Sequence, residues 1–289
     1  MKLTAENYYS PQMNKKYCSA SQYLSIIGRP AVPGCEARAM AELNGEYVQE
    51  TTKAMLIGSI LDALWEGATP EELVDRFPDC VSSRGATKGQ IKSEYMQAIQ
   101  LFNRTKQDPL FTRYMSGEKQ VIMKGKIEGL PFKIKMDSFH PGVAIVDLKT
   151  TQDSHPMHRY YDKMTGQRLP FYLWWAYDAQ LAIYREIVRQ ETGETLPCFI
   201  AAIDKKPHPR PEVIQLDDVL LNNALETIKQ NCQKIIMLKS GDIDPIRCED
   251  DDCDYCRDTY QCKGITSSEF ETMDDKGGTE AAEQTSGAL

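Results

Sequence analysis

The order of hydrophobic patterns along this 289-residue chain predicts an α/β protein with a central mixed β-sheet flanked by helices. Two observations carry this prediction. Apolar residues recur at helical spacing through the first part of the chain and then alternate with polar residues at the period that marks strands. Beyond these strands, a long apolar helix is followed by further strands and a final helix. This order favours a single sheet covered by helices.

Composition places the chain among ordinary globular proteins. Hydrophobic residues make up 41% and charged residues 26% of the sequence, which is enough apolar material for a sizeable core. Mean hydropathy is -0.48, no apolar run reaches the length of a membrane span, and the first residues lack the apolar stretch of a signal peptide. We therefore expect a cytoplasmic protein with no membrane partner.

The formal net charge of -8 argues at first against a nucleic-acid partner, because phosphate binding requires lysine and arginine. The acidic excess, however, lies in residues 247–263 and 269–289. The remaining chain is close to neutral and can still carry a basic groove. The global charge therefore excludes little.

The helices of the first part are predicted from spacing and from the residues that end them. Ile57, Ile60, Leu61 and Leu64 share one helical face. An Asp-Pro pair stops the last of these helices. Helices are expected at residues 19–27, 36–43, 51–66, 70–77 and 88–106.

The strands are predicted from alternation and from turn residues. Turns at Glu128-Gly129 and at residues 140–142 separate three alternating stretches, which we interpret as a three-stranded meander. The next helix begins with the aromatic run FYLWWAY, which would either pack in the core or stack on bases. The meander is expected at 119–127, 130–138 and 143–150, helices at 171–192 and 217–239, and strands at 196–203 and 212–216.

The chain divides into four predicted parts. Residues 1–50 form an N-terminal helical segment, and residues 51–245 form the core. Residues 246–265 are rich in cysteine and are predicted to bind metal. Residues 266–289 lack apolar periodicity, so we expect a disordered acidic tail there.

Charged side chains gather on one face of the predicted meander. Because side chains alternate along a strand, the second strand turns Lys133, Lys135 and Asp137 away from the core. The third strand turns Asp147 and Lys149 to one face. Two adjacent strands can therefore present two carboxylates and a lysine together.

Converging carboxylates repel each other unless a cation lies between them. Oxygen ligands favour a hard divalent ion, Mg²⁺ or Mn²⁺. A lysine beside such an ion can help to activate a water or can stabilise charge on a phosphate. The alternative is a solvated strand face with ordinary charges.

The spacing of these residues resembles the PD-(D/E)xK nuclease superfamily. Asp137 is followed by nine residues and then by Asp147-Leu-Lys149, as an acid on one strand is followed by an acid-x-lysine on the next in that superfamily. Met136 stands where the family usually has proline. The resemblance is to the RecB-like branch, and within it to phage and prophage exonucleases of the exonuclease VIII (RecE) type. It implies a restriction-endonuclease-like core.

Two further motifs extend the resemblance. Gly58-Ser-Ile-Leu-Asp62 occupies the place of a Gly-x-x-x-His motif whose histidine binds metal, so Asp62 would be the third metal ligand. Gln180-Leu-Ala-Ile-Tyr184 matches a Gln-x-x-x-Tyr motif that contacts the DNA backbone in the family. The alternatives are a polar helix position for Asp62, and a partly buried Gln180 with a core Tyr184. Glu118 is a weaker candidate for the rim of the site.

Four of the nine cysteines cluster near the end of the chain. Cys253-x₂-Cys256-x₅-Cys262 resembles the iron–sulfur nucleases of the same branch, the AddB subunit and the CRISPR-associated exonucleases. The resemblance implies a 4Fe-4S cluster whose remaining ligand, Cys35, lies before the core. Cys248 competes with Cys262 for the last place. A structural zinc ion with four thiolates, or no metal at all, remains open.

The expected function is a Mg²⁺- or Mn²⁺-dependent exonuclease acting on double-stranded DNA ends. Asp62, Asp137 and Asp147 would hold the metal, Lys149 would assist the attacking water, and Gln180 and Tyr184 would position the DNA. The resemblance also implies phage-type recombination with a single-strand annealing protein, a ring-shaped homo-oligomer, and a bacterial or phage-infected host cell. The alternative function is a degenerate nuclease fold that binds DNA as a scaffold and is stabilised by a structural metal.

Overall fold

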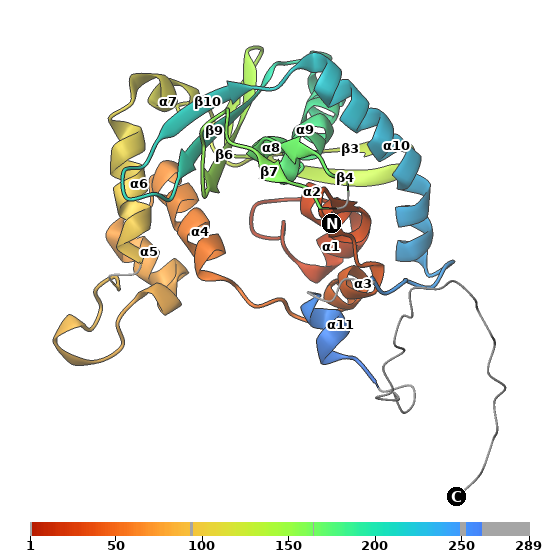
Figure 1. Cartoon of the computed structure of the whole chain (residues 1–289), viewed down its shortest axis with the longest axis horizontal. Coiled ribbons are helices and arrows are strands. Elements are labelled where there is room, and N and C mark those ends of the chain that lie inside the picture. Colours follow the sequence, from red (N-terminus) through yellow and green to blue (C-terminus); the bar gives the residue numbers. More distant parts are fainter. Residues whose placement is uncertain (1, 93–94, 164, 249–252, 262–289) are drawn as a thin grey trace, which may run out of the picture.

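The computed structural model describes residues 2–92, 95–163, 165–248 and 253–261 (Figure 1). Its centre is a mixed four-stranded sheet with the strand order β10-β9-β6-β5. The central pair is parallel, and the two outer pairs are antiparallel. The predicted α/β class with a mixed sheet is therefore confirmed. The strands of this sheet are β5 (Ser138–His140), β6 (Ala144–Thr151), β9 (Cys198–Asp204) and β10 (Pro211–Gln215).

The predicted three-stranded meander is wrong in one respect. β3 (Val121–Ile127) and β4 (Leu130–Met136) form a separate antiparallel hairpin. The second predicted strand breaks at Asp137, and only its last part, β5, joins the central sheet. At the break, the Asp137 carboxylate accepts a hydrogen bond of 2.8 Å from the backbone N–H of Leu148 on β6. Asp137 thereby lies at the junction between the hairpin and the sheet.

Helices cover both faces of the sheet, as Figure 1 shows. One core joins the sheet and the hairpin to α2, α9 and α10, and a second core joins the opposite sheet face to α4, α6 and α7. The helices are α1 (Pro11–Lys16), α2 (Ala20–Ile27), α3 (Glu36–Asn44), α4 (Lys53–Glu66), α5 (Pro70–Arg76), α6 (Met96–Lys106), α7 (Pro109–Tyr114), α8 (Phe171–Trp174), α9 (Tyr177–Thr192), α10 (Asp218–Ser240) and α11 (Asp254–Asp258). Short strand pairs are β1 (Gly28–Arg29) with β2 (Val32–Pro33), and β7 (Tyr160–Tyr161) with β8 (Arg168–Leu169).

Capping residues explain where several helices begin. Ser19 and Gln22 form a reciprocal capping box at α2, and the Asp217 side chain caps α10. The helix expected over 171–192 is instead broken into α8 and α9, because Ala176 adopts a left-handed φ of 53°. The helix expected over 88–106 begins as α6 only at Met96.

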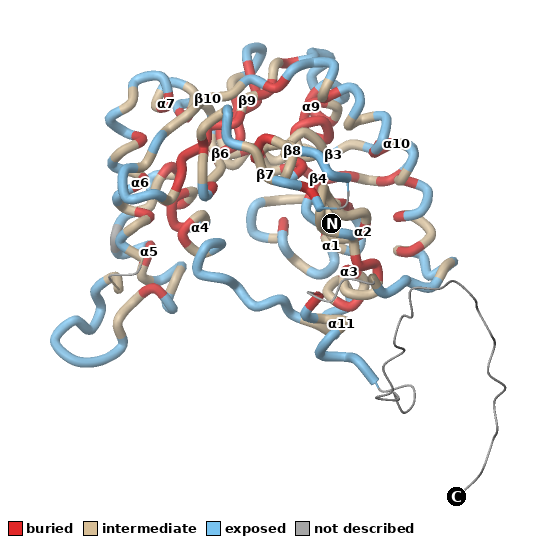
Figure 2. Tube along the Cα trace, in the orientation of Figure 1, coloured by how far each residue is buried: buried red, intermediate tan, exposed pale blue. Residues whose placement is uncertain are grey.

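Strand β6 is buried on both faces, which Figure 2 shows in red. Val146 and Leu148 pack in the core that contains α4, whereas Ile145 belongs to the core that contains α9. Asp147 shares the face of Ile145 and is only 2% exposed. The alternative of a solvated strand face is therefore wrong for Asp147.

Lys133 departs from the expectation of an open charged face, since it is 1% exposed. The N-terminal segment covers it. Its ammonium donates hydrogen bonds to the backbone carbonyl of Tyr8 and to the side-chain oxygen of Asn14, and the backbone of Cys18 pairs with the hairpin beside it. In the part of the chain that the structure describes, no helix is long and apolar enough to cross a membrane.

Candidate active site and thiol cluster

One cavity of about 450 Å³ brings together every residue that the sequence predicted for the catalytic site. We call it the carboxylate cavity. Helix α4 contributes Asp62, the break between the hairpin and the sheet contributes Asp137, and β6 contributes its acid and lysine. Helix α9 contributes its glutamine and tyrosine from successive turns of one face. The predicted residues in its lining are Asp62, Asp137, Asp147, Lys149, Gln180 and Tyr184.

Asp147 is held from two sides. Its Oδ2 lies 2.5 Å from the Nζ of Lys149, and its Oδ1 accepts a hydrogen bond of 2.7 Å from Gln180 Nε2. Gln180 Nε2 also lies 3.0 Å from the Tyr184 hydroxyl. The two motifs that the sequence analysis treated separately therefore form one hydrogen-bonded set, with Asp147 at its centre.

The carboxylates are close enough to perturb one another. Burial raises the pKa of Asp137 to about 6, with a further contribution from the charge of Asp147. Burial also raises the pKa of Asp62 well above its ordinary value, and the charge of Asp137 adds to this. Burial lowers the pKa of Lys149, but the combined attraction of Asp147, Tyr177 and Asp137 outweighs it, so the net shift is upward. The cavity lining holds four carboxylates and three lysines, so the lysines offset the acids only in part.

The donor set fits a hard divalent ion. Three carboxylate side chains line one cavity, and the cation paired with the buried Oδ2 of Asp147 is Lys149, 2.5 Å away. Buried carboxylates without enough donors are stabilised by a cation. Oxygen ligands of this kind suit Mg²⁺ or Mn²⁺ better than soft metals.

Some lining residues were not anticipated from the sequence. Glu66 lies one turn after Asp62 on α4, and this i, i+4 spacing could have indicated it. Gln120 lies in the lining with a positive φ of 53°, and its buried Oε1 lacks a hydrogen-bond partner in the described structure. Glu118, the weaker candidate, lies outside this lining, and its backbone pairs with Phe139 of β5.

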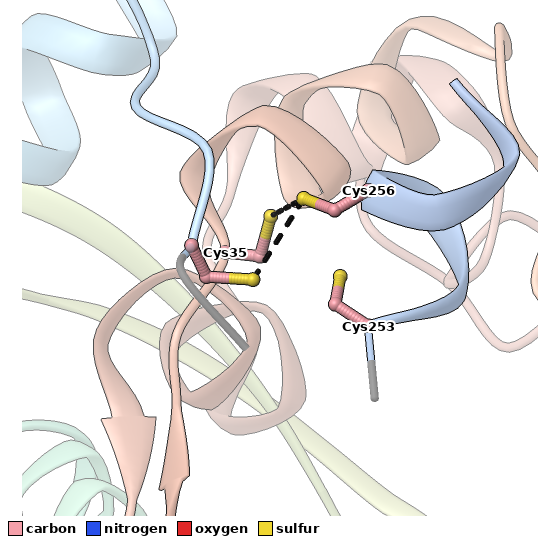
Figure 3. Close-up of side chains that lie close together, drawn as sticks. Cys35, Cys253 and Cys256 are labelled. Carbon is pink, nitrogen blue, oxygen red and sulfur yellow. Dashed lines mark hydrogen bonds between the residues drawn. The ribbon is translucent and has the colours of Figure 1, made fainter. Parts of the chain in front are cut away.

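A second group of ligands lies where the two ends of the chain meet. The sulfurs of Cys35, Cys248, Cys253 and Cys256 all lie within 4.8 Å of one another. Figure 3 shows three of them turned toward a common centre. We call this group the thiol cluster. Cys262, the competing ligand, lies outside the described residues, as does the predicted acidic tail at 266–289.

The cluster connects three segments. Cys35 caps the N-terminus of α3, Cys253 precedes α11, and Cys248 follows α10. Polar contacts reinforce this meeting of chain ends, because Glu36 forms an ion pair with Lys234 of α10 and accepts a hydrogen bond from the Ile246 N–H. The N-terminal segment is also joined to the start of the cysteine-rich segment by a backbone hydrogen bond from the Ala37 N–H to the Ile246 carbonyl.

The sheet, with Asp147 and Lys149 on β6, Asp137 at the junction with the hairpin and covering helices on both faces, defines the PD-(D/E)xK nuclease class. The family model described as "PDDEXK-like domain of unknown function (DUF3799)" matches residues 19–259. The chain belongs to this family, and through it to the PD-(D/E)xK superfamily. A search of curated proteins found no match.

One solved structure agrees with this assignment. A protein of Eubacterium rectale, whose crystal structure is described as "Putative exonuclease", is 40% identical to this chain. The match covers 92% of this chain and 97% of that chain, with a TM-score of 0.85. A second structure, that of SSO0001, is 15% identical over 66% of this chain and 82% of that chain, and its TM-score of 0.25 is too low to support an argument.

Proposed function

We propose that this protein is a divalent-metal-dependent deoxyribonuclease that removes nucleotides from DNA ends. The single observation that carries this proposal is the carboxylate cavity, whose lining includes Asp62, Asp137 and Asp147 together with Lys149. Family membership and the likeness to the Eubacterium rectale protein support the same chemistry. The exonuclease activity, the preference for double-stranded ends and the dependence on Mg²⁺ or Mn²⁺ are parts of the proposal.

Each residue has a role that its contacts suggest. The three aspartates would hold the ion, which when bound supplies Lewis acidity toward the phosphate and toward a water. Lys149, fixed by Asp147, places a positive charge where negative charge grows on the phosphate. Gln180 orients Asp147 and would, with Tyr184, contact the DNA backbone.

End-labelled duplex DNA tests the proposal directly. We expect the wild-type protein to release nucleotides with Mg²⁺ or Mn²⁺ and to stop when EDTA is added. Asp147→Asn should lower the rate by about 100-fold or more, because it removes a charged ligand while preserving shape. Glu118→Gln is the matched control and should behave as wild type. If the wild type releases nothing with either metal but binds DNA, the scaffold alternative holds instead.

We propose also that the thiol cluster binds a metal centre that fastens the chain ends to the core. Converging thiolates require a soft cation. The spacing of Cys253, Cys256 and Cys262 supports the 4Fe-4S cluster of the AddB-like nucleases. The distances between the sulfur atoms support zinc with Cys248 as the fourth ligand. Cys256 lies 3.6 Å from Cys35 and 3.8 Å from Cys248 between sulfurs, and bonds of about 2.3 Å to one tetrahedral ion place thiolates about 3.8 Å apart.

Anaerobic purification followed by absorbance and metal analysis decides between the two centres. A brown protein containing iron and sulfide would establish the cluster, and a colourless protein with one equivalent of zinc would establish the single ion. Cys262→Ser and Cys248→Ser provide the matched pair of variants. The substitution that releases the metal identifies the fourth ligand, and a protein with neither metal contradicts the proposal.

The biological setting is proposed from the family resemblance. A RecE-like exonuclease would act in phage-type recombination in the cytoplasm of a bacterium or an infected host cell. It would hand its single-stranded product to an annealing protein and would gain processivity from a ring of identical subunits. Size-exclusion chromatography with light scattering, with and without DNA, tests the oligomer.

A further inference from the structure

A second cavity adjoins the carboxylate cavity and shares part of its wall. Its volume is about 730 Å³, and Asp62, Leu148 and Lys149 line both cavities. The proposed metal site and catalytic lysine therefore lie at the boundary between the two. A DNA strand whose phosphate lies at Asp62 and Lys149 would have its next nucleoside in one cavity or the other.

The second cavity is lined by aromatic side chains, and we call it the aromatic cavity. Its rings come from Tyr160 of β7, Trp174 and Trp175 at the end of α8, and Tyr177 of α9. Tyr160 and Trp174 stack at 5.6 Å between ring centroids with an interplanar angle of 22°. The Lys149 ammonium lies 4.8 Å from the Tyr177 centroid, so this ring joins the aromatic wall to the catalytic lysine.

Of these rings Trp175 is exposed, whereas Tyr160 and Tyr177 are partly buried against the core. Phe171 at the start of the aromatic run is 1% exposed, whereas Trp175 is 39% exposed. The break at Ala176, with its φ of 53°, separates the tryptophans from the continuous face of α9. An alanine in the left-handed region costs conformational energy, and such costs tend to occur at functional sites.

The polar groups around the cavity narrow the kind of ligand. Within the described structure the buried Tyr160 hydroxyl has no hydrogen-bond partner, so an apolar ligand alone would leave it unsatisfied. Lys205 lines the same cavity. At its rim the Arg29 guanidinium lies 4.1 Å from the Trp175 centroid and donates a hydrogen bond to the Trp174 carbonyl. Flat faces, an unsatisfied hydroxyl and two cations match a nucleobase and its adjoining phosphates.

We propose that the aromatic cavity holds an unpaired nucleobase of the strand being cut, stacked against its rings beside the scissile phosphate. The inference rests on the proposed nuclease function. A cavity of this size suits a small organic group and not a base pair within a duplex. The terminal base pair must therefore open before cleavage, and ends that fray easily are the better substrates.

Single-stranded oligonucleotides carrying 2-aminopurine at successive positions test the binding step in the Asp147→Asn background. We expect quenching at one position next to the phosphate at the metal site. Trp175→Ala should weaken binding about tenfold, which matches a typical loss of one base–aromatic stack, and Trp175→Phe should recover most of the affinity. Tyr161→Ala, an exposed neighbour outside the cavity lining, is the matched control and should bind as the parent does.

Cleavage kinetics separate this inference from the function on which it rests. Wild type should prefer duplexes with a mismatched terminal pair over fully paired ones. Trp175→Ala should lose that preference through KM more than through kcat. An active wild type whose Trp175→Ala variant cuts both ends alike with unchanged KM and unchanged quenching overturns the base site alone. A wild type inactive with Mg²⁺ and Mn²⁺ overturns the nuclease proposal.

Discussion

The carboxylate cavity and the thiol cluster differ in how far their structure is expected to depend on a bound metal. Both bring together groups that repel when ionised. The carboxylates lie on elements that the sheet and its two cores already hold in place. The thiols join the start of α3 to segments after α10. The fold therefore positions the carboxylate cavity, whereas the thiol cluster is expected to help complete the fold.

The largest expected effect is on catalysis without a loss of structure. Lys149→Ala should lower kcat/KM by about 100- to 1000-fold, because a preorganised charge at the phosphate is worth that much. The melting temperature in the presence of Mg²⁺ should change little. Steady-state kinetics and thermal melts measure the two quantities. Lys126→Ala, which removes an exposed lysine of β3, is the control. A loss of kcat/KM below tenfold in Lys149→Ala would contradict a catalytic role for Lys149.

The opposite pattern is expected at the thiol cluster. Replacing Cys35 and Cys253 together by serine should release the metal and cost about 3 kcal/mol or more, since structural metal binding is part of the folding free energy. The corresponding fall in Tm is about 10 °C for a chain of this size.

Thermal melts with metal analysis check this, and Cys232→Ala is the control for loss of a buried cysteine outside the cluster. The folded fraction should keep its kcat. A double variant with unchanged Tm would show that packing alone holds the chain ends.

Asp62 provides a smaller and more selective effect. Asp62→Ala should raise the Mg²⁺ concentration needed for half-maximal cleavage by about 10- to 100-fold, because it weakens the binding of the metal. Asp62→His restores the residue type that the resemblance implies and should retain cleavage within about tenfold. Metal titrations of activity measure both variants. Equal activity of Asp62→Ala and wild type at every metal concentration would remove Asp62 from the ligand set.

The smallest expected effect is a pH dependence of the metal-free protein. The pKa of Asp137 rises from 3.8 to about 6 on folding. Between these values the folded state holds a proton that the unfolded chain has released, so stability falls as pH rises through this window. We expect the Tm in EDTA to fall by a few degrees between about pH 4 and pH 6, and Mg²⁺ to reduce this fall.

Two variants separate the causes of that slope. Asp137→Asn should reduce the fall of Tm with pH in EDTA. It should also reduce the change in Tm that Mg²⁺ causes. Asp178, whose pKa burial also raises to about 6, lies outside the carboxylate cavity and is the matched control. Asp178→Asn should flatten the slope without changing the response to Mg²⁺. An identical Mg²⁺ response in all three proteins would contradict the charge repulsion that we assign to Asp137.

Local periodicity was sufficient for much of the candidate site. Side chains alternate along a strand, so Asp147 and Lys149 had to share a face wherever their strand lay in the sheet. Helical spacing placed Gln180 and Tyr184 on one face of α9 by the same kind of argument. The helices α2, α4 and α10 begin at Ser, Thr and Asp caps. Such features depend on neighbours within one turn or one pleat and are visible in the sequence.

Other features depended on contacts between distant segments. The covering of Lys133 by Tyr8 and Asn14 joins residues more than one hundred positions apart, and alternation alone had placed that lysine on an open face. The break of the second strand at Asp137 and the left-handed Ala176 are likewise decided by what packs around them.

By itself, then, the sequence determined the class of fold, the order of its elements and the identity of the acids and lysine at the candidate active site. Only the tertiary structure decided that Asp147 faces a buried cavity, that Cys248 lies beside Cys35, and that an aromatic cavity adjoins the proposed metal site. The reason is physical. Periodicity records which side of an element a residue occupies, whereas burial, charge coupling and cavities arise from the second element that covers it.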